Sequence, residues 1–205
     1  MFVLAIIFEH ERSLSYLLLL VAIVWWVWQF FLILAYPRAT RLWANLFVRG
    51  LGGILVMLPT WISVNNLYFM SPWLMLILFL IIWGSDTTAY FSGRFLGKRK
   101  LLPHVSPGKT WAGFWGAFVT SVVLALICMF STSQFSHHRI FVLVLFVATM
   151  LFSVLGDLVE SMYKRQAGIK DSGNIFPGHG GLLDRIDSLT AAAPLFFMGL
   201  MLYIQ

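Results

Sequence analysis

The chain has 205 residues, of which 60% are hydrophobic and 11% are charged. The charged share is less than half of the roughly 25% that is typical of soluble domains, which excludes a water-soluble globular protein. The 14 basic and 8 acidic residues give a net charge of +6. They are absent from four long stretches, residues 13–37, 50–85, 110–138 and 188–205. This pattern indicates a polytopic membrane protein.

The basic balance does not indicate nucleic-acid binding, because the charges are confined to short segments between apolar stretches. The single cysteine, Cys128, lies in an apolar run, so neither an intramolecular disulfide nor a cysteine metal cluster can form. The eight apolar residues before Glu9 lack a basic n-region and are not a secretory signal. They resemble the end of a longer hydrophobic segment.

A helix needs about 20 residues to cross the hydrocarbon core of a membrane. On this length we expect six membrane helices: residues 13–37, 50–64, 72–90, 111–131, 140–156 and 189–204. The second and third are separated because Asn65, Asn66, Ser71 and Pro72 favour a turn between them. The fifth is of marginal length. The sequence thus predicts an all-α polytopic membrane protein, with residues 1–205 forming a single integral-membrane domain.

Six crossings place the connecting loops alternately on two sides of the membrane. Twelve of the basic residues then fall on one side, and only Arg12 and Arg139 fall on the other. The positive-inside rule makes the first side cytoplasmic. The same side carries two long polar segments, residues 86–110 and 157–187, in which acids and bases are mixed. Such a mixture suggests a metal bound by acids and an anionic substrate bound by Lys and Arg.

Two acidic pairs with i, i+3 spacing stand beside the fifth and sixth stretches: Asp157 with Glu160, and Asp184 with Asp187. If residues 156–165 are helical, Ser161 and Lys164 lie on the stripe of the first pair. Such carboxylates can coordinate Mg²⁺, although each pair alone is explained as well by helix-end charges with basic partners. Both pairs together favour the metal site, because carboxylates near the hydrocarbon are costly and are mostly functional.

Two further segments are candidates for phosphate binding. Residues 170–181 form a Gly- and Pro-rich turn whose backbone N–H groups can face phosphate oxygens, or which is simply a flexible connector. Ser106, Lys109 and Thr110 are donors at the predicted start of the fourth helix, where the helix dipole favours an anion. A basic patch touching anionic lipid is the alternative there. The segment mimics a P-loop, but Pro103 stands where that motif needs glycine.

Three motifs then carry a resemblance to a known family: Ser161-x2-Lys164-Arg165-x4-Lys170-Asp171-x5-Pro177-x-His179-Gly180-Gly181-x2-Asp184-Arg185-x-Asp187, Asp86-x3-Tyr90-x2-Gly93-Arg94, and Ser106-Pro107-x-Lys109-Thr110-Trp111. They resemble the signatures of the phosphatidate cytidylyltransferase (CDP-diacylglycerol synthase) family. The first motif is long and specific, and the similarity runs from about residue 80 to the end of the chain.

The resemblance implies transfer of CMP from CTP to phosphatidate, with release of pyrophosphate, in phospholipid biosynthesis. It implies Mg²⁺, with room for a second monovalent or divalent cation, and a bacterial inner-membrane enzyme whose active site faces the cytoplasm. The expected partners are CTP, phosphatidate from the bilayer and membrane lipids, but not nucleic acid, and a homodimer is left open.

Site residues are expected in three groups. Those expected at the reacting phosphates are Lys164, Arg165, Asp171, His179, Arg185 and Asp187. Those expected to bind substrate are Ser106, Lys109, Thr110, Ser161 and Lys170. Those expected at the metal are Asp157, Glu160, Asp184 and Asp187.

Two departures from the family and three rival functions remain. The family usually has an acidic residue where Ala112 stands, which affects a minor loop contact. Its members usually carry additional N-terminal spans, so we expect a shortened chain or a divergent paralogue. The rivals are a transporter or channel with intramembrane carboxylates, a CTP-dependent lipid or polyprenol kinase, and a non-catalytic subunit. The transporter is disfavoured because the charges cluster at one face rather than at mid-membrane.

Overall fold

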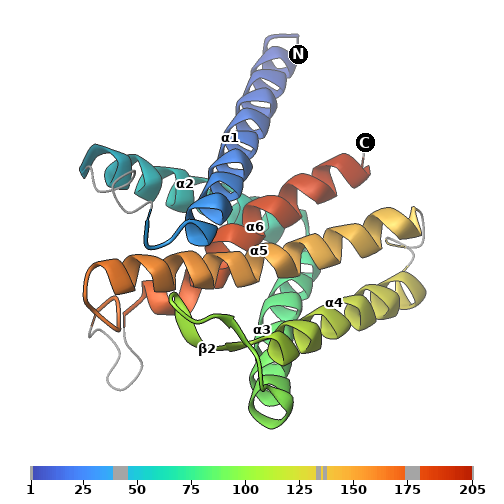
Figure 1. The fold of residues 1–205 in the computed structure, drawn as a ribbon. Coiled ribbons are helices and arrows are strands. Elements are labelled where there is room, and N and C mark those ends of the chain that lie inside the picture. The colour runs from blue at the N-terminus through green and yellow to red at the C-terminus, as the bar shows by residue number, and fades with distance from the viewer. Residues whose placement is uncertain (1, 39–45, 133–134, 136–137, 174–180, 205) are drawn as a thin grey trace.

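The computed structural model describes residues 2–38, 46–132, 135, 138–173 and 181–204. Its elements are six helices and one hairpin: α1 (Phe2–Leu34), α2 (Leu46–Met70), α3 (Pro72–Leu96), β1 (Lys100–Leu102), β2 (Ser106–Thr110), α4 (Trp111–Ser131), α5 (Arg139–Gln166) and α6 (Leu183–Ile204) (Figure 1). All six helices contain a stretch long and apolar enough to cross a membrane. The predicted all-α class and the number of spans are therefore confirmed.

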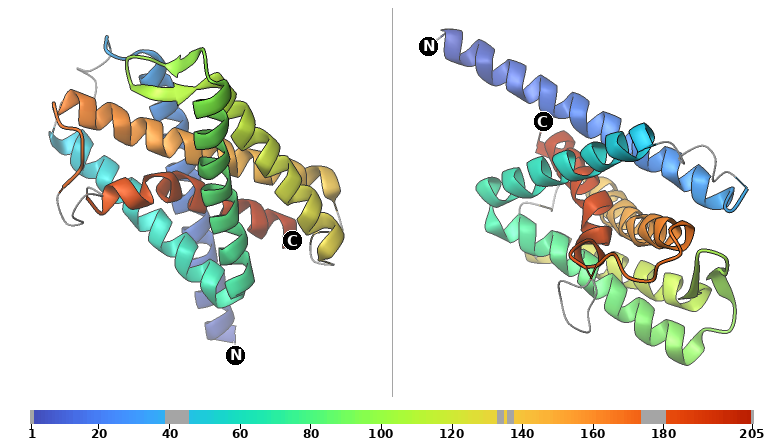
Figure 2. Two further views of the ribbon diagram at one scale, coloured as in Figure 1. Left: turned by 90° about the horizontal axis from the view of Figure 1, so that it is seen from below. Right: turned by 90° about the vertical axis from the view of Figure 1, so that its left-hand side faces the viewer.

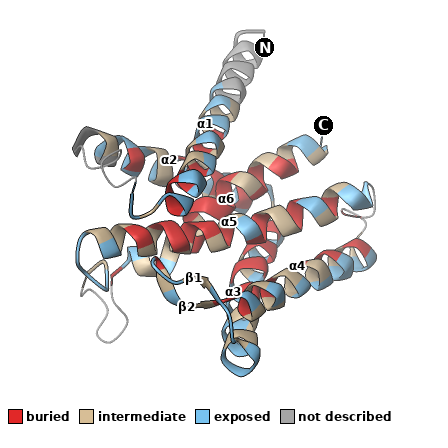
Figure 3. Ribbon diagram, viewed as in Figure 1, coloured by how far each residue is buried: buried red, intermediate tan, exposed pale blue. Residues whose placement is uncertain are grey.

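Helices α5 and α6 form the centre of the bundle, and buried residues concentrate along both of them (Figure 3). Phe146 from α5 and Phe196 from α6 are fully buried, with ring centroids 6.2 Å apart. Helices α3 and α4 lie side by side next to this pair, and the N-terminal end of α1 extends beyond the other helices (Figure 2). The central pair is thus the most shielded part of the bundle, with 56% of the most apolar stretch buried in each of the two helices.

The outer surface of the bundle is apolar, as a hydrocarbon solvent requires. Trp61, Phe69 and Ile140 are 69%, 76% and 81% exposed, whereas the buried hydroxyls of Thr60, Ser63 and Thr149 donate to backbone oxygens. For example, the buried hydroxyl of Thr60 donates to the backbone oxygen of Thr190, 3.0 Å away, and so joins α2 to α6. Unpaired polar groups would be costly in lipid, so this arrangement fits a membrane-embedded fold.

The helices are longer than the sequence predicted at their polar ends. Helix α2 continues to Met70 because the Asn66 amide donates to the backbone oxygen of Ile62 (2.8 Å) and so tolerates a helical position. Helix α5 has 28 residues, so the expectation of a marginal fifth span was wrong. Its polar end is extended by i, i+4 pairs such as Lys164 with Glu160 (2.7 Å).

The hairpin between α3 and α4 was not predicted. Its strands are antiparallel, with Lys100 opposite Thr110 and Leu102 opposite Ser106, and Val105 beneath the turn is buried. Strand β2 leads directly into α4, where the Thr110 hydroxyl caps the helix by accepting from the backbone N–H of Gly113 (3.2 Å). The segment expected to be a loop is therefore an ordered element that carries Lys109 to a fixed place.

Candidate active site

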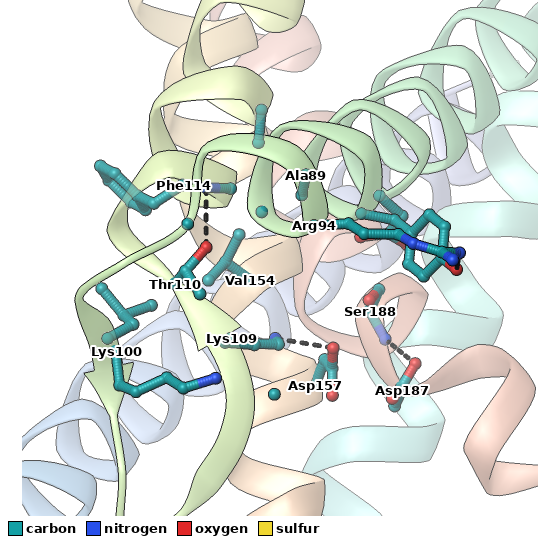
Figure 4. A pocket seen from close by; sticks show the side chains of 18 of the residues that line it. Ala89, Arg94, Lys100, Lys109, Thr110, Phe114, Val154, Asp157, Asp187 and Ser188 are labelled. Carbon is teal, nitrogen blue, oxygen red and sulfur yellow. Dashed lines mark hydrogen bonds and ion pairs between the residues drawn. The ribbon is translucent and has the colours of Figure 1, made fainter.

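A cavity of about 870 Å³ opens where the polar ends of four helices meet the hairpin (Figure 4). Its lining comes from α3, the hairpin, the start of α4, the end of α5, the connection after α5 and the start of α6. The ionisable residues among the lining are Asp86, Arg94, Lys100, Lys109, Asp157, Lys164, Asp171, Asp184, Arg185 and Asp187. Both polar segments singled out in the sequence thus contribute to one site.

One side of the cavity, which we term the acidic wall, is formed by α5, α6 and the connection between them. It carries four acids and two cations: Asp157, Lys164, Asp171, Asp184, Arg185 and Asp187. The Lys164 ammonium lies 2.7 Å from Glu160 Oε2 and 2.6 Å from Asp184 Oδ1. This lysine therefore ties the end of α5 to the first turn of α6.

Asp184 organises the chain before α6. Its Oδ2 atom accepts from the backbone N–H (2.9 Å) and hydroxyl (2.9 Å) of Ser172 and from the backbone N–H of Gly181 (2.7 Å). Only 8% of the Asp184 side chain is exposed. Both carboxylate oxygens are thus engaged, Oδ1 by Lys164 and Oδ2 by the three donors of Ser172 and Gly181.

The acidic wall depends on a close approach of α5 to α6 at Gly156. A Cβ atom at this position would collide with the backbone oxygen of Asp187 and would lie 3.2 Å from the Ala191 Cβ atom. Because glycine has no side chain, Asp157 on α5 and Asp187 on α6 can face the same cavity. The Asp187 Oδ1 atom also accepts from the backbone N–H of Ser188 (2.6 Å).

The opposite side, which we term the basic wall, is formed by α3 and the hairpin. It carries three cations and one acid: Asp86, Arg94, Lys100 and Lys109. The Lys109 ammonium reaches across the cavity to Asp157 Oδ2, 2.6 Å away (Figure 4). This ion pair joins the two walls and brings together two residues that are 48 positions apart in the sequence.

Eight of the predicted site residues line the cavity: Lys109, Thr110, Asp157, Lys164, Asp171, Asp184, Arg185 and Asp187. Glu160 and Ser161 lie just behind the lining and contact Lys164 (2.7 Å) and Asp157 (3.4 Å), respectively. Ser106, Arg165 and Lys170 are not among the lining residues. His179 falls outside the described residues.

Three lining residues of the basic wall were not among the predicted site residues: Asp86, Arg94 and Lys100. Asp86, Tyr90 and Arg94 recur every four residues, so they occupy one stripe of α3 and all line the cavity. The motif Asp86-x3-Tyr90-x2-Gly93-Arg94 contained this stripe, but the predicted end of the third span at residue 90 placed Arg94 in a loop, whereas α3 continues to Leu96.

The sequence matches the cytidylyltransferase family over residues 1–203. The chain belongs to this family. It is 45% identical over 202 residues to the phosphatidate cytidylyltransferase of Haemophilus influenzae, an alignment that covers 93% of this chain and 69% of that protein. It is 42% identical over 199 residues to the phosphatidate cytidylyltransferase of Pseudomonas aeruginosa, covering 95% of this chain and 72% of that protein.

A third alignment of this cytidylyltransferase is shorter. It is 47% identical over 124 residues to the phosphatidate cytidylyltransferase of Bacillus subtilis, covering 60% of this chain and 46% of that protein. Family membership agrees with the motifs around the cavity, since the resemblance seen in the sequence was carried by those motifs.

The donor set of the cytidylyltransferase cavity fits Mg²⁺. Within the described parts of the chain, no three Asp, Glu, His or Cys side chains come close enough together to hold a metal ion. Mg²⁺ does not need three, because it commonly binds one or two carboxylates and completes its shell with water and substrate phosphates. Asp157 and Asp187 both face the cavity, and the buried Glu160 Oε1 atom behind them has no hydrogen-bond partner.

The charges on the described lining balance. Five acids face five cations, so the cavity presents no net charge. A nucleoside triphosphate and a phosphomonoester together bring several negative charges, and neutralising them is the main electrostatic task of phosphoryl-group chemistry. A divalent cation at the acidic wall would supply part of the positive charge that the side chains lack.

Proposed function

We propose that this cytidylyltransferase transfers CMP from CTP to phosphatidate and releases CDP-diacylglycerol and pyrophosphate. The observation that carries the proposal is the cavity itself: residues of all three motifs that carry the family resemblance line it at the polar end of a membrane bundle. Relatives that align over most of the chain are named phosphatidate cytidylyltransferases. The volume of about 870 Å³ suits a nucleotide together with a lipid headgroup.

The reaction needs positioning more than proton transfer. An oxygen of the lipid phosphate, already ionised at neutral pH, attacks the α-phosphorus of CTP, and the bond between that phosphorus and the bridging oxygen to the β-phosphate breaks. The electron pair leaves with pyrophosphate, so no general base is required. The cost lies in holding two anions in line, which cations on both sides of the reacting phosphorus reduce.

The residues of the two walls divide this task. Lys164 and Arg185 stand at the acidic wall, where they can contact the phosphates that react, while Lys109 reaches into the cavity from the hairpin. Asp184 keeps Lys164 in place through their 2.6 Å ion pair and holds the preceding chain through Ser172 and Gly181. Thr110 supports Lys109 indirectly by capping α4.

Asp157 and Asp187 are the residues we propose to hold Mg²⁺, with Glu160 behind them. When bound, the metal would neutralise charge on the triphosphate and on the departing pyrophosphate. Lys109 now pairs with Asp157 at 2.6 Å, so a cation bound to Asp157 would release the ammonium to contact substrate phosphate. Asp184 is a less suitable direct ligand because it makes four polar contacts and only 8% of its side chain is exposed, compared with 32% of Asp157.

We further propose that the cavity faces the cytoplasm of a bacterial inner membrane, so that CTP enters from the cytosol and the lipid from the bilayer. The bias of basic residues to this side of the membrane supports it. In a Cys128→Ser background, a cysteine replacing Gly108 should resist an impermeant thiol reagent in intact cells and react after lysis. A cysteine replacing Ser131, at the other end of α4, should react in intact cells.

Gly108 is a suitable probe position because a Cβ atom there meets nothing within 4 Å, whereas one at Gly97 would collide with the backbone oxygen of Gly93. Labelling of Gly108→Cys from outside intact cells would contradict the cytoplasmic site.

The fate of the CTP phosphates tests the proposed reaction. Purified protein is incubated with phosphatidate, Mg²⁺ and CTP labelled at either the α- or the γ-phosphate. We expect the α-label in the lipid product and the γ-label in pyrophosphate. Lipid that gains the γ-label would instead show a CTP-dependent kinase. If the protein is folded and the lipid gains neither the α- nor the γ-label, both nucleotide-dependent reactions are rejected.

A further inference from the structure

Two of the cations that line the cavity, Arg94 and Lys100, have no acidic partner among the described residues. Lys109 and Lys164 form ion pairs of 2.6–2.7 Å with carboxylates. Arg94 and Lys100, both on the basic wall, have no carboxylate within 4.0 Å in the part of the chain that the structure describes. Their charges are therefore not neutralised by the protein, which makes them available to an anionic ligand.

Arg94 and Lys100 lie on opposite sides of the Lys109–Asp157 pair, as Figure 4 shows. Arg94 extends from α3, which is a membrane span, whereas Lys100 belongs to the hairpin outside the spans. A reaction between a water-soluble anion and a lipid anion needs two such places, one on the aqueous side and one on the lipid side. The positions of Arg94 and Lys100 match that requirement.

The Arg94 side chain is held in a defined direction. Its Nη1 atom donates to the Tyr90 hydroxyl (2.8 Å), and its guanidinium carbon lies 6.0 Å from the centre of the Tyr90 ring. This contact engages one of the five N–H donors of a guanidinium and leaves donors for a phosphate. A cation oriented in advance loses less conformational entropy when a ligand binds.

The surface beside Arg94 is apolar and exposed on the same helix. Tyr90, Phe91 and Phe95 are 58%, 51% and 74% exposed, respectively, and lie within the span of α3. A ligand whose phosphate contacts Arg94 could lay hydrocarbon chains along these rings, whereas a nucleotide would leave them uncovered. The neighbourhood of Arg94 thus matches both parts of a phosphomonoester lipid: the cation suits its phosphate, and the exposed rings suit its hydrocarbon chains.

We propose that Arg94, oriented by Tyr90, binds the phosphate of the lipid substrate where it enters the cavity from the bilayer. This inference rests on the proposed function and adds the place of the lipid to it. Tyr90 is then a positioning residue, since it acts through Arg94. The guanidinium fork can contact two terminal phosphate oxygens, and a phosphomonoester, with three terminal oxygens and up to two negative charges, attracts it more strongly than a phosphodiester, whose two terminal oxygens share one charge.

The first test measures the KM values for phosphatidate and CTP separately in mixed micelles. Arg94→Ala should raise the KM for phosphatidate about tenfold or more, the scale of a lost charge-assisted hydrogen bond, and should change the KM for CTP less than about twofold. Arg94→Lys and Tyr90→Phe should give intermediate increases. Arg99→Ala, an exposed cation on the adjoining segment outside the cavity, is the matched control and should leave both values unchanged.

Three outcomes would overturn the inference: a KM increase for CTP alone, no KM change in Arg94→Ala, or equal effects of Arg94→Ala and Arg99→Ala. The last would indicate general attraction of anionic lipid to the membrane surface. A lower melting temperature of Arg94→Ala with unchanged KM values would assign Arg94 to the stability of the α3 C-terminus instead.

A second measurement is independent of catalysis. Short-chain phosphatidate, without CTP, should raise the melting temperature of the wild-type protein and of Arg99→Ala, but not that of Arg94→Ala, whereas the same concentration of phosphatidylcholine should have no effect. If wild type binds phosphatidate in this way but transfers no CMP, the proposed reaction fails while the lipid site stands. Stabilisation of Arg94→Ala to the wild-type extent would reject the site itself.

Discussion

The two walls of the cavity treat their charges differently. On the acidic wall, Lys164 is fixed between Glu160 and Asp184, and Asp184 is bonded in turn to Ser172 and Gly181. On the basic wall, Arg94 and Lys100 have no carboxylate partner among the described residues. We propose from this difference that the acidic wall holds preorganised groups for the chemical step, whereas the basic wall attracts and orients the anionic substrates.

The walls also differ in their surroundings. In α5 and α6, 56% of the most apolar stretch is buried, compared with 33% in α3. The acidic wall therefore belongs to the most buried part of the bundle. Carboxylates are costly there, so each needs hydrogen-bond or ion-pair partners in well-defined positions. Substitutions on that wall should affect turnover, and those on the basic wall should affect substrate affinity.

Removal of a carboxylate from the acidic wall should have the largest effect. Asp157→Asn loses the negative charge that we propose to bind Mg²⁺ and that pairs with Lys109 in the structure. We expect kcat to fall at least about 100-fold, the scale for loss of an electrostatic element of the transition state. Steady-state kinetics at saturating Mg²⁺ measure it, and chelation of Mg²⁺ from the wild type should abolish turnover. Near-normal turnover of the variant would remove Asp157 from the metal site.

A change in the spacing of the acidic wall should have the next largest effect. In Gly156→Ala the new methyl group would collide with the backbone oxygen of Asp187, so α5 and α6 must separate. We expect a lower melting temperature and a kcat reduced about tenfold, as misplaced reacting groups cost at least that much. Gly53→Ala is the matched control, because its Cβ atom meets nothing within 4 Å. Equal behaviour of the two variants would show that this close approach is unimportant.

Arg185→Lys tests whether a cation of the acidic wall acts on the transition state. The substitution keeps the charge but loses the bidentate geometry of the guanidinium, so we expect kcat to fall severalfold, about 1 kcal/mol of barrier, with little change in KM. Full kinetics with both substrates separate the two parameters. An intact kcat with a raised KM would make Arg185 a substrate anchor like the residues of the basic wall.

Lys100→Ala should have the smallest effect of the four. Lys100 is exposed on the hairpin, and an exposed charge contributes at most about 1 kcal/mol, so the KM for CTP should rise about threefold to fivefold and more so at low salt. A titration of CTP at two ionic strengths measures this. A fall in kcat without a change in KM would contradict the assignment of substrate attraction to the basic wall.

Sequence reasoning captured the acidic wall well because its parts are local. The i, i+3 spacing of Asp157 with Glu160 and of Asp184 with Asp187 needs only a helix, and both helices formed. The contacts of Asp184 were not predictable, because its partners Ser172 and Gly181 lie outside the helices and strands. Spacing alone suggested a metal ligand there, while the structure adds an organising role.

The basic wall was less predictable because it depends on contacts between distant segments. The hairpin is short and its strands lack an apolar alternation, so nothing in residues 100–110 distinguished it from a loop. The ion pair of Lys109 with Asp157 joins elements that only the packing of α4 against α5 brings together. Hydropathy predicted the number of spans correctly. It did not predict the polar ends of α3 and α5, because these ends extend beyond the apolar stretches by which the spans are recognised.

The most direct test of the account is whether both substrates occupy this cavity. In the Cys128→Ser background, a cysteine replacing Gly108, which lines the cavity, is labelled with a bulky thiol reagent in detergent. We expect CTP with Mg²⁺, and more strongly CTP and phosphatidate together, to slow labelling severalfold, whereas a cysteine replacing Arg99 outside the cavity should react at the same rate throughout. Equal labelling of Gly108→Cys with and without saturating substrates would contradict the assignment of CMP transfer to this cavity.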